Sequence, residues 1–269
     1  MFKNKLVIIT GGSSGLGKAL AKRLAGQGAR LALIARDQAK LKSVREELSA
    51  EYPGTKIETF SCNVADFAAV EKTINEIVAR MGPPDILINS AGVLKEGYFE
   101  KFPLEEFREL MDVNYFGALH CIKAALPWFK QKGMGRIVNV SSMGGRIGTF
   151  GYAAYCSSKF ALTGLTEALR AELKPQNIKF HLVCPPEFES PMVDELNTYR
   201  SIENKTMVQT MPVLKAITVA DDVIKGMEQD RYLIISGGIT RILDWVNRIS
   251  PGLSRAVVDY RIRKVYRGP

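Results

Sequence analysis

The sequence predicts an α/β fold, a single domain built on a doubly wound parallel sheet, and three observations support this prediction. Short β-rich runs alternate with longer helical stretches through the first 185 residues. The short runs are continuously apolar, as in strands that helices cover on both faces. A chain of 269 residues, 46% of them apolar and 24% charged, can also bury one large core without disulfides.

Hydrophobic periodicity gives the elements in order. Apolar runs are expected to form strands at Leu6–Thr10, Arg30–Ala35, Lys56–Ser61, Ile86–Asn89, Arg136–Val140 and Lys179–Val183. Stretches with apolar residues three and four apart are expected to form helices at Lys18–Gln27, Gln38–Glu51, Val70–Met81, Leu104–Lys132 and Tyr155–Leu173. Residues 186–217 are expected to form an irregular substrate loop with one or two short helices. A helix over Thr218–Glu228, with Thr218 as its N-cap, and a strand over Tyr232–Ile235 then complete a domain of residues 1–239.

Residues 240–269 are expected to form a basic amphipathic helical extension. The segment has two acidic residues, Asp244 and Asp259, and therefore holds +5 of the net charge of +9. Its seven basic residues are Arg241, Arg248, Arg255, Arg261, Arg263, Lys264 and Arg267. Apolar residues around Trp245 recur at helical spacing on both sides of Pro251. Such a helix suits an anionic membrane surface, and packing on the domain or on a partner subunit is the alternative.

Composition argues against several classes of protein. The four cysteines are widely spaced, at Cys62, Cys121, Cys156 and Cys184, and the only two histidines are His120 and His181. Neither a disulfide framework, a metal site nor Ser-His-Asp chemistry is therefore expected. The N-terminus enters a strand at once, and no window reaches about 18 apolar residues, so neither a signal peptide nor a membrane span is expected. No nucleic-acid-binding motif occurs. A cytoplasmic protein is expected, peripheral on a membrane if the extension binds one.

A glycine-rich turn between the first strand and the first helix predicts a Rossmann-type nucleotide site. Glycines allow a tight turn and close approach to a pyrophosphate, whose charge meets the free N–H groups of the helix start. The residues expected to bind the cofactor here are Gly11, Ser13, Ser14, Gly15, Leu16 and Gly17. A strand-to-helix turn without a ligand is the alternative.

The end of the second strand indicates which cofactor binds. An acidic residue at this point would accept hydrogen bonds from a free ribose 2′-hydroxyl, but the sequence has Ala35 followed by Arg36. A guanidinium suits a 2′-phosphate, which favours NADP(H) over NAD. The acidic residue Asp37 comes next, so NAD remains the alternative cofactor.

A tyrosine and a lysine four residues apart, Tyr155 and Lys159, indicate acid–base chemistry. This spacing puts both side chains on one face of a helix. An ammonium beside a phenol is expected to lower the pKa of the phenol, which then exchanges a proton with an alkoxide. Ser142 follows a strand directly and can donate a hydrogen bond to a carbonyl oxygen, with Ser141 as the alternative residue.

Together, these motifs and Asn89-Ser90-Ala91-Gly92 resemble the short-chain dehydrogenase/reductase family over residues 5–195. The resemblance implies a catalytic tetrad of Asn114, Ser142, Tyr155 and Lys159, in which the family's 13-residue spacing selects Ser142 over Ser141. It also implies further cofactor contacts by Asn63, Val64, Asn89, Ala91, Gly92, Tyr155, Lys159, Pro185, Phe188 and Ser190. Asn63 stands where the family usually has aspartate, and Pro186 where it usually has a glycine, so the local backbone is expected to differ there.

The stretch Cys184-Pro185-Pro186-Glu187-Phe188-Glu189-Ser190-Pro191 resembles the 3-ketodihydrosphingosine reductase branch of this family. That resemblance implies a homo-oligomeric enzyme of lipid metabolism that reduces 3-ketodihydrosphingosine to dihydrosphingosine with NADPH, with tyrosine as the general acid. Two alternatives are a reductase for another carbonyl, such as a 3-oxoacyl thioester, a steroid or a small ketone, and a module that senses NADP(H) without turnover.

Overall fold

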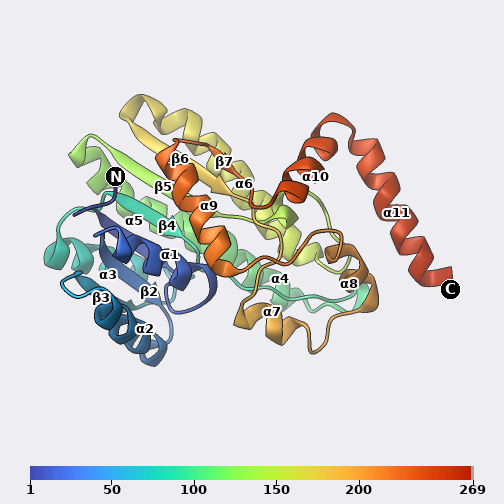
Figure 1. The fold of residues 1–269 in the computed structure, drawn as a ribbon, viewed down its shortest axis with the longest axis horizontal. Coiled ribbons are helices and arrows are strands. Elements are labelled where there is room, and N and C mark those ends of the chain that lie inside the picture. Colours follow the sequence, from blue (N-terminus) through green and yellow to red (C-terminus); the bar gives the residue numbers. More distant parts are fainter. Residues whose placement is uncertain (268–269) are drawn as a thin grey trace.

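The computed structural model of the protein describes residues 1–267 and contains one seven-stranded parallel sheet with helices on both faces (Figure 1). The strand order is β3-β2-β1-β4-β5-β6-β7. The strands are β1 Leu6–Thr10, β2 Arg30–Ala35, β3 Ile57–Ser61, β4 Ile86–Asn89, β5 Gly135–Val140, β6 Ile178–Val183 and β7 Leu233–Ile234. The order turns back between β1 and β4, so the loops after these strands separate and leave a crevice. The predicted fold class is confirmed.

The helices agree with the periodicity, with small shifts at their ends. They are α1 Gly15–Gly26, α2 Gln38–Glu51, α3 Phe67–Met81, α4 Leu104–Met111, α5 Gly117–Lys132, α6 Ala153–Leu173, α7 Pro191–Leu196, α8 Ile202–Val208, α9 Ala216–Glu228, α10 Gly238–Ile249 and α11 Pro251–Arg267. The short helices α7 and α8 lie within the predicted irregular loop.

Two hydrophobic layers hold the helices against the sheet. Along β1, Val7 and Ile9 face the layer that α1, α2 and α9 build, whereas Leu6 and Ile8 face the layer of α3 and α5. All four side chains are fully buried. Because successive residues of a strand point to opposite faces, a strand with a layer on each side must be apolar throughout. This explains why the predicted strands showed no alternation.

Two predicted elements differ from the structure. The single helix expected over Leu104–Lys132 is interrupted by a π-helical turn, Asp112–Phe116, which joins α4 to α5 without a loop. The prediction of Thr218 as the N-cap of α9 is wrong. The helix begins at Ala216, so Thr218 lies inside its first turn, where its N–H donates to the Lys215 oxygen at 3.0 Å. Lys215 is the N-cap instead; it directly follows Leu214, which forms an isolated parallel β-bridge with Phe188 and is therefore still extended.

The C-terminal segment begins slightly before the predicted boundary at residue 240. Thr240 and Asp244 of α10 are buried against the domain, and Asp244 forms an ion pair with Arg146. Helix α11 turns back after Pro251 and contacts α8 (Figure 1). The last two residues of the predicted extension, 268–269, lie outside the described part. Within residues 1–267, no helix is both long and apolar enough to cross a membrane.

Candidate active site

The turn between β1 and α1 is shaped to approach a phosphate closely. Gly11 and Gly15 have φ angles of +69° and +50°, which favour glycine. A Cβ on Gly17 would lie 2.2 Å from the Gly11 backbone oxygen, so a side chain there would push α1 away from the turn. The first turn of α1 carries no acidic residue. Its free N–H groups therefore present partial positive charge at the crevice, as an anion site requires.

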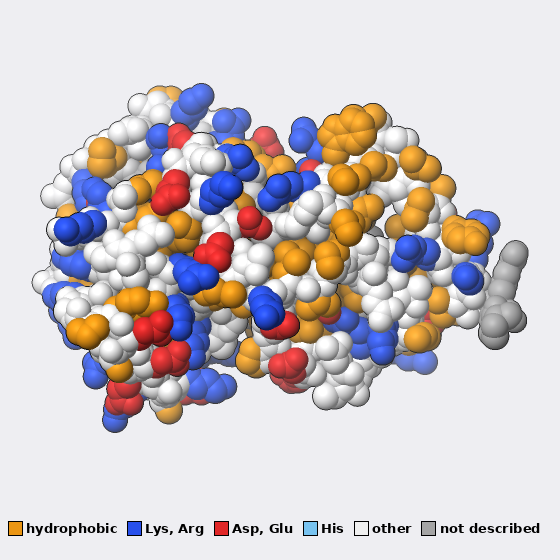
Figure 2. Space-filling view, in the orientation of Figure 1, with side chains coloured by type: hydrophobic (Ala, Val, Ile, Leu, Met, Phe, Trp, Pro, Cys, Tyr) orange, Lys and Arg blue, Asp and Glu red, His pale blue; other side chains and the backbone are white. Residues whose placement is uncertain are grey.

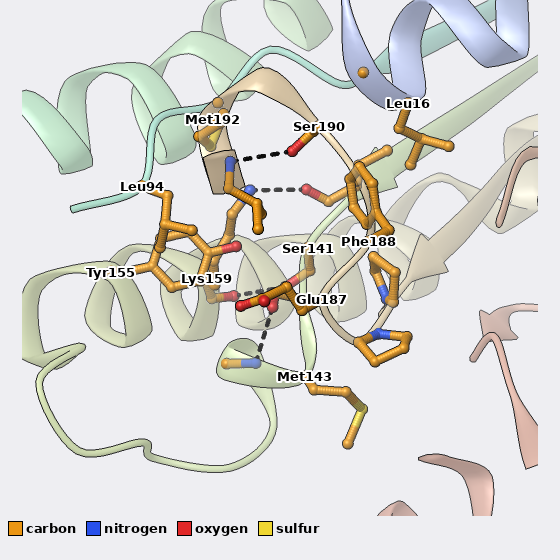
Figure 3. A pocket seen from close by; sticks show the side chains of 18 of the residues that line it. Leu16, Leu94, Ser141, Met143, Tyr155, Lys159, Glu187, Phe188, Ser190 and Met192 are labelled. Carbon is orange, nitrogen blue, oxygen red and sulfur yellow. Dashed lines mark hydrogen bonds between the residues drawn. The ribbon is translucent and has the colours of Figure 1, made fainter. Parts of the chain in front are cut away.

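A cleft extends from this turn across the carboxyl ends of β4, β5 and β6. The structure brings together in its lining most of the predicted site residues: Gly11, Ser14, Gly15, Leu16, Gly17, Gly92, Ser142, Tyr155, Lys159, Pro185, Phe188 and Ser190. Figure 3 shows Leu16, Phe188 and Ser190 near the glycine turn, with Tyr155 and Lys159 deeper in the same pocket. The acid–base pair and the phosphate turn therefore share one cleft.

Tyr155 lies in the first turn of α6 and remains partly exposed to the cleft. Burial raises the pKa of Tyr155 to about 12, and hydrogen bonding with the Ser142 hydroxyl opposes this rise. The Ser142 oxygen also accepts from the Gly144 N–H at 3.0 Å, so the Ser142 O–H remains a donor, to Tyr155 here or to a ligand oxygen placed between the two hydroxyls. Both hydroxyls can thus donate to one oxygen atom placed between them.

Lys159 is almost completely buried below Tyr155. Its ammonium lies 5.8 Å from the centre of the Tyr155 ring and donates to the Val140 carbonyl at 3.0 Å. Burial lowers the pKa of Lys159 to about 8. The predicted lowering of the tyrosine pKa by the lysine is wrong for this structure, because burial acts on both groups and disfavours both charges.

Asn114 sits in the π-helical turn and faces the strand-end loop after β4. Its side chain accepts from the Val93 N–H at 2.8 Å and donates to the Val93 oxygen at 2.9 Å. It also donates to the Ser158 hydroxyl at 3.0 Å. A Cβ on Gly92 would lie 3.1 Å from the Asn114 oxygen and 3.6 Å from the Lys159 nitrogen. Asn114 therefore holds the loop that lies beside the lysine.

The predicted adenosine contacts lie at the other end of the crevice. Arg36 and Asn63 flank a second hollow, which is also lined by Arg108 of α4. The Asp37 carboxylate caps α2 by accepting from the Lys40 N–H at 3.0 Å, which also lowers the pKa of Asp37. The exposed Arg36 side chain is thus next to a carboxylate that already accepts a hydrogen bond from the first turn of α2.

Besides Arg36 and Asn63, four further predicted cofactor contacts do not line the main cleft. Asn89 is buried and donates to the Asn139 oxygen at 2.8 Å, so its side chain ties β4 to β5. Val64 is buried against Gly117. Ala91 lies behind Gly11, where its N–H donates to the Thr10 hydroxyl at 3.1 Å. Ser13 belongs to the glycine turn without lining the cleft.

The segment after β6 forms the wall opposite α6. The Ser190 hydroxyl accepts from the Val193 N–H at 3.3 Å and so caps α7. Sequence reasoning missed the rest of this wall, whose members come from the irregular loop and from the turn before α6: Thr149, Tyr152, Glu187, Met192, Val193, Val208 and Met211. Only the clustering of apolar residues in 186–217 could have indicated it.

Comparisons with known proteins show the family to which this chain belongs. The family described as short chain dehydrogenase matches residues 5–201. The 3-dehydrosphinganine reductase of Danio rerio is 39% identical over 84% of this chain and 69% of its own. The 3-ketodihydrosphingosine reductase of Dictyostelium discoideum is 35% identical over 94% and 79%. The solved structure of actinorhodin polyketide ketoreductase with NADPH has a TM-score of 0.80 at 26% identity, over 88% of this chain and 98% of that one.

The family match covers well over half of the chain, and its residues include the glycine turn, Asn114, Ser142, Tyr155 and Lys159. The sheet order and the cleft across the strand ends are those of a dinucleotide-binding oxidoreductase fold. The chain belongs to the short-chain dehydrogenase/reductase family, as a relative of the 3-ketodihydrosphingosine reductases.

Proposed function

We propose that this protein reduces the keto group of 3-ketodihydrosphingosine to a secondary alcohol with NADPH, and that Tyr155 is the general acid. One observation carries the proposal: Tyr155, Ser142 and Lys159 line a single cleft with the glycine turn. The relatives whose names include 3-dehydrosphinganine or 3-ketodihydrosphingosine reductase supply the substrate class.

The residues of the crevice fit a bound dinucleotide. The pyrophosphate would lie against the glycine turn, where Gly11 and Gly17 leave no space for a Cβ. The adenosine would extend toward Arg36 and Asn63, and the nicotinamide toward Phe188 and Ser190. When bound, NADPH supplies the hydride for the reduction.

The proton comes from the chain itself. With a pKa of about 12, Tyr155 carries its proton at neutral pH and is ready to donate it in the direction of reduction. As the carbonyl carbon is reduced, its oxygen gains negative charge. The Tyr155 hydroxyl donates its proton to this oxygen while the Ser142 hydroxyl stabilises the charge by a hydrogen bond. We assign the restoring of this proton to Lys159, whose ammonium lies 5.8 Å from the centre of the Tyr155 ring.

The apolar part of the cleft lining suits a long alkyl chain. It includes Leu94, Met192 of α7, Val208 of α8 and Met211, which follows α8. The deciding assay offers NADPH with 3-ketodihydrosphingosine, a 3-oxoacyl thioester, a steroid ketone and a small ketone. The proposal expects the highest kcat/KM for the sphingoid ketone. A higher value for another ketone would support a different reductase, and NADPH binding without turnover of any ketone would support a sensor.

Arg36→Ala is expected to reduce the preference for NADPH. A guanidinium that pairs with the 2′-phosphate contributes a charge-assisted hydrogen bond, so its loss should raise KM for NADPH about 10- to 100-fold. KM for NADH should stay nearly constant, and Lys40→Ala on the exposed start of α2 serves as the control. Equal effects of Arg36→Ala on both cofactors would argue against a 2′-phosphate contact.

We also propose that α10 binds an anionic membrane surface. Its large apolar residues lie three and four positions apart and are each more than half exposed: Ile239, Ile242, Trp245 and Ile249. Its polar residues Thr240 and Asp244 are buried instead. Figure 2 shows the hydrophobic side chains gathered over α10 and the start of α11. Exposed Arg248 and Arg255 lie next to them, and basic residues beside an apolar helix face attract anionic lipids.

Trp245→Glu is expected to reduce co-sedimentation with phosphatidylglycerol vesicles at least about tenfold, because it removes one large anchoring side chain and adds a repelled charge. Met134→Glu, an exposed apolar residue at the opposite ends of the strands, is the control. The binding should weaken with salt and with phosphatidylcholine vesicles. A change in oligomer size with unaltered vesicle binding would instead assign this face to a second copy of the chain.

We further infer a homo-oligomer formed through α4, α5 and α6. Leu104 of α4, Phe116 of the π-helical turn before α5 and Phe160 of α6 are large apolar side chains that are exposed there. Sedimentation velocity in the absence of lipid tests this inference, and a monomer at micromolar concentration would contradict it.

A further inference from the structure

Two charged side chains line the cleft in the described part of the chain, and they carry opposite charges. Lys159 lies beneath Tyr155, as described above. Glu187 comes from the segment between β6 and α7, and Figure 3 shows it with Tyr155 and Lys159 among the lining side chains. The negative charge of Glu187 acts on Tyr155 and contributes to the rise in its pKa. A carboxylate thus lies near the point where the carbonyl is reduced, in a wall that is otherwise largely apolar.

An arginine outside the pocket lining fixes this carboxylate. Arg200 donates from Nη1 to Glu187 Oε1 at 3.1 Å and from Nη2 to Oε2 at 2.5 Å. Nη2 also donates to the Tyr152 hydroxyl at 3.2 Å. The side chains of Arg200 and Glu187 are only 4% and 12% exposed. The fork geometry sets the plane of the carboxylate.

Stability alone does not explain such a pair. A buried ion pair must overcome the desolvation of both charges, and apolar residues of similar size often serve stability as well or better. The pair also sits in the wall of a cleft that is proposed to take a lipid-like ketone, where an apolar wall would be the simpler choice. A function at the pocket surface accounts for the charge.

The carboxylate retains the capacity to bind a ligand. Two carboxylate oxygens offer about four acceptor positions, and a bidentate arginine occupies two of them. Arg200 does not line the cleft, whereas Glu187 does, so the remaining positions are the ones a ligand can reach. The complementary ligand group is a cation with several N–H donors. A primary ammonium fits, provided that it lies close to the carbonyl group that Tyr155 and Ser142 receive.

We propose that Glu187 is a specificity-determining residue that binds the ammonium group of a 2-amino-3-ketone while Tyr155 and Ser142 bind the adjacent keto oxygen. This inference rests on the proposed function, since the sphingoid ketone carries its amino group on the carbon next to the keto carbon. It adds a reason for the selectivity: an oxoacyl thioester or a steroid ketone has no cation to balance Glu187, and a buried carboxylate with unfilled acceptor positions disfavours such a ligand.

The test compares two substrates that differ only in the amino group. One is 3-ketodihydrosphingosine, and the other is 1-hydroxyoctadecan-3-one, which has hydrogen in its place. The wild-type protein is expected to show a kcat/KM about 10- to 100-fold higher for the amino ketone, the usual range for a charge-assisted hydrogen bond. Glu187→Gln, which keeps the shape and an acceptor for Arg200, should remove this preference: kcat/KM should fall for the amino ketone and should not fall for the deamino ketone, which no longer faces an unbalanced carboxylate.

Two controls separate recognition from a structural role. Glu189→Gln removes an exposed carboxylate two residues away and should keep the preference, whereas Glu187→Asp should restore part of it. An equal loss of activity of Glu187→Gln on both substrates would overturn the proposal in favour of a purely structural ion pair. An unchanged preference would overturn it as well.

The wild-type protein provides a measurement that does not depend on the folding of a variant. Its preference for the amino ketone should decline as the pH rises through the pKa of the substrate amine, since a neutral amine no longer pairs with a carboxylate. The deamino ketone corrects for titration of the enzyme itself, and a pH-independent preference would contradict the proposal. Failure of the wild-type protein to reduce either long-chain ketone, while it reduces other ketones, would overturn the proposed function instead.

Discussion

Tyr155→Phe is expected to lower kcat about 10²- to 10⁴-fold, the usual contribution of a positioned general acid. The variant loses the one hydroxyl that can deliver a proton to the new alkoxide. The ring itself keeps its packing against Tyr152, whose ring centre lies 5.5 Å away. NADPH affinity should therefore change little, as quenching of protein fluorescence by titrated NADPH would measure.

Tyr152→Phe is the matched control for this experiment. Tyr152 lines the same cleft three residues earlier, and its hydroxyl accepts from Arg200 rather than facing Ser142. Removal of that one hydrogen bond should lower kcat/KM by about tenfold at most. A Tyr155→Phe variant that retained more than a tenth of the wild-type kcat, or a Tyr152→Phe variant that lost as much as Tyr155→Phe, would contradict the assignment of the acid.

Local sequence patterns were sufficient for the framework of the site. The glycine turn could be predicted because steric limits act within a few residues: Gly11 must adopt a positive φ, and Gly17 must lie against the Gly11 backbone. Continuous apolar runs such as Ile86–Asn89 could be predicted as strands that helices cover on both faces for a similarly local reason. The spacing of Tyr155 and Lys159 put both on one helix face, and they do line one cleft.

The chemistry of the site depended on contacts that are distant in sequence. The spacing of Tyr155 and Lys159 suggested a lowered tyrosine pKa, but the degree of burial set by surrounding strands and loops raises it. Arg200 and Glu187 lie 13 residues apart across an irregular loop, where no periodicity indicates a pair. The π-helical turn at Asn114 left the apolar spacing of its helix intact and so gave no signal.

Helix α10 illustrates a different limit of sequence patterns. Its amphipathic spacing was readable, but periodicity alone does not say which face packs against the domain. The pairing of Asp244 with Arg146 and the hydrogen bond from Arg241 to the Ile235 oxygen turn the polar face inward. The apolar face with Trp245 is consequently exposed. Partners supplied by other parts of the chain decided the orientation.

Lys159→Met is expected to inactivate the protein and at the same time to stabilise it. The buried ammonium has a pKa of about 8, lowered from 10.5 by burial, so at neutral pH the folded protein holds a charge that its surroundings disfavour. A shift of this size corresponds to about 3 kcal/mol of the free energy of unfolding. Methionine has a similar length and no charge. The variant should therefore unfold at higher urea concentration at pH 7, by up to this amount.

The pH dependence distinguishes this cause from better packing. Below pH 8 both the folded and the unfolded chain carry the lysine proton, and the penalty is complete. Between pH 8 and 10.5 the unfolded chain binds more protons than the folded one, so the stability of the wild-type protein rises with pH relative to the variant. The difference between the two should shrink across this window and nearly vanish at its upper end, before Tyr155 titrates in the folded state. A difference in urea midpoint that stays constant from pH 7 to 10 would mean that packing, and not the buried charge, stabilises the variant.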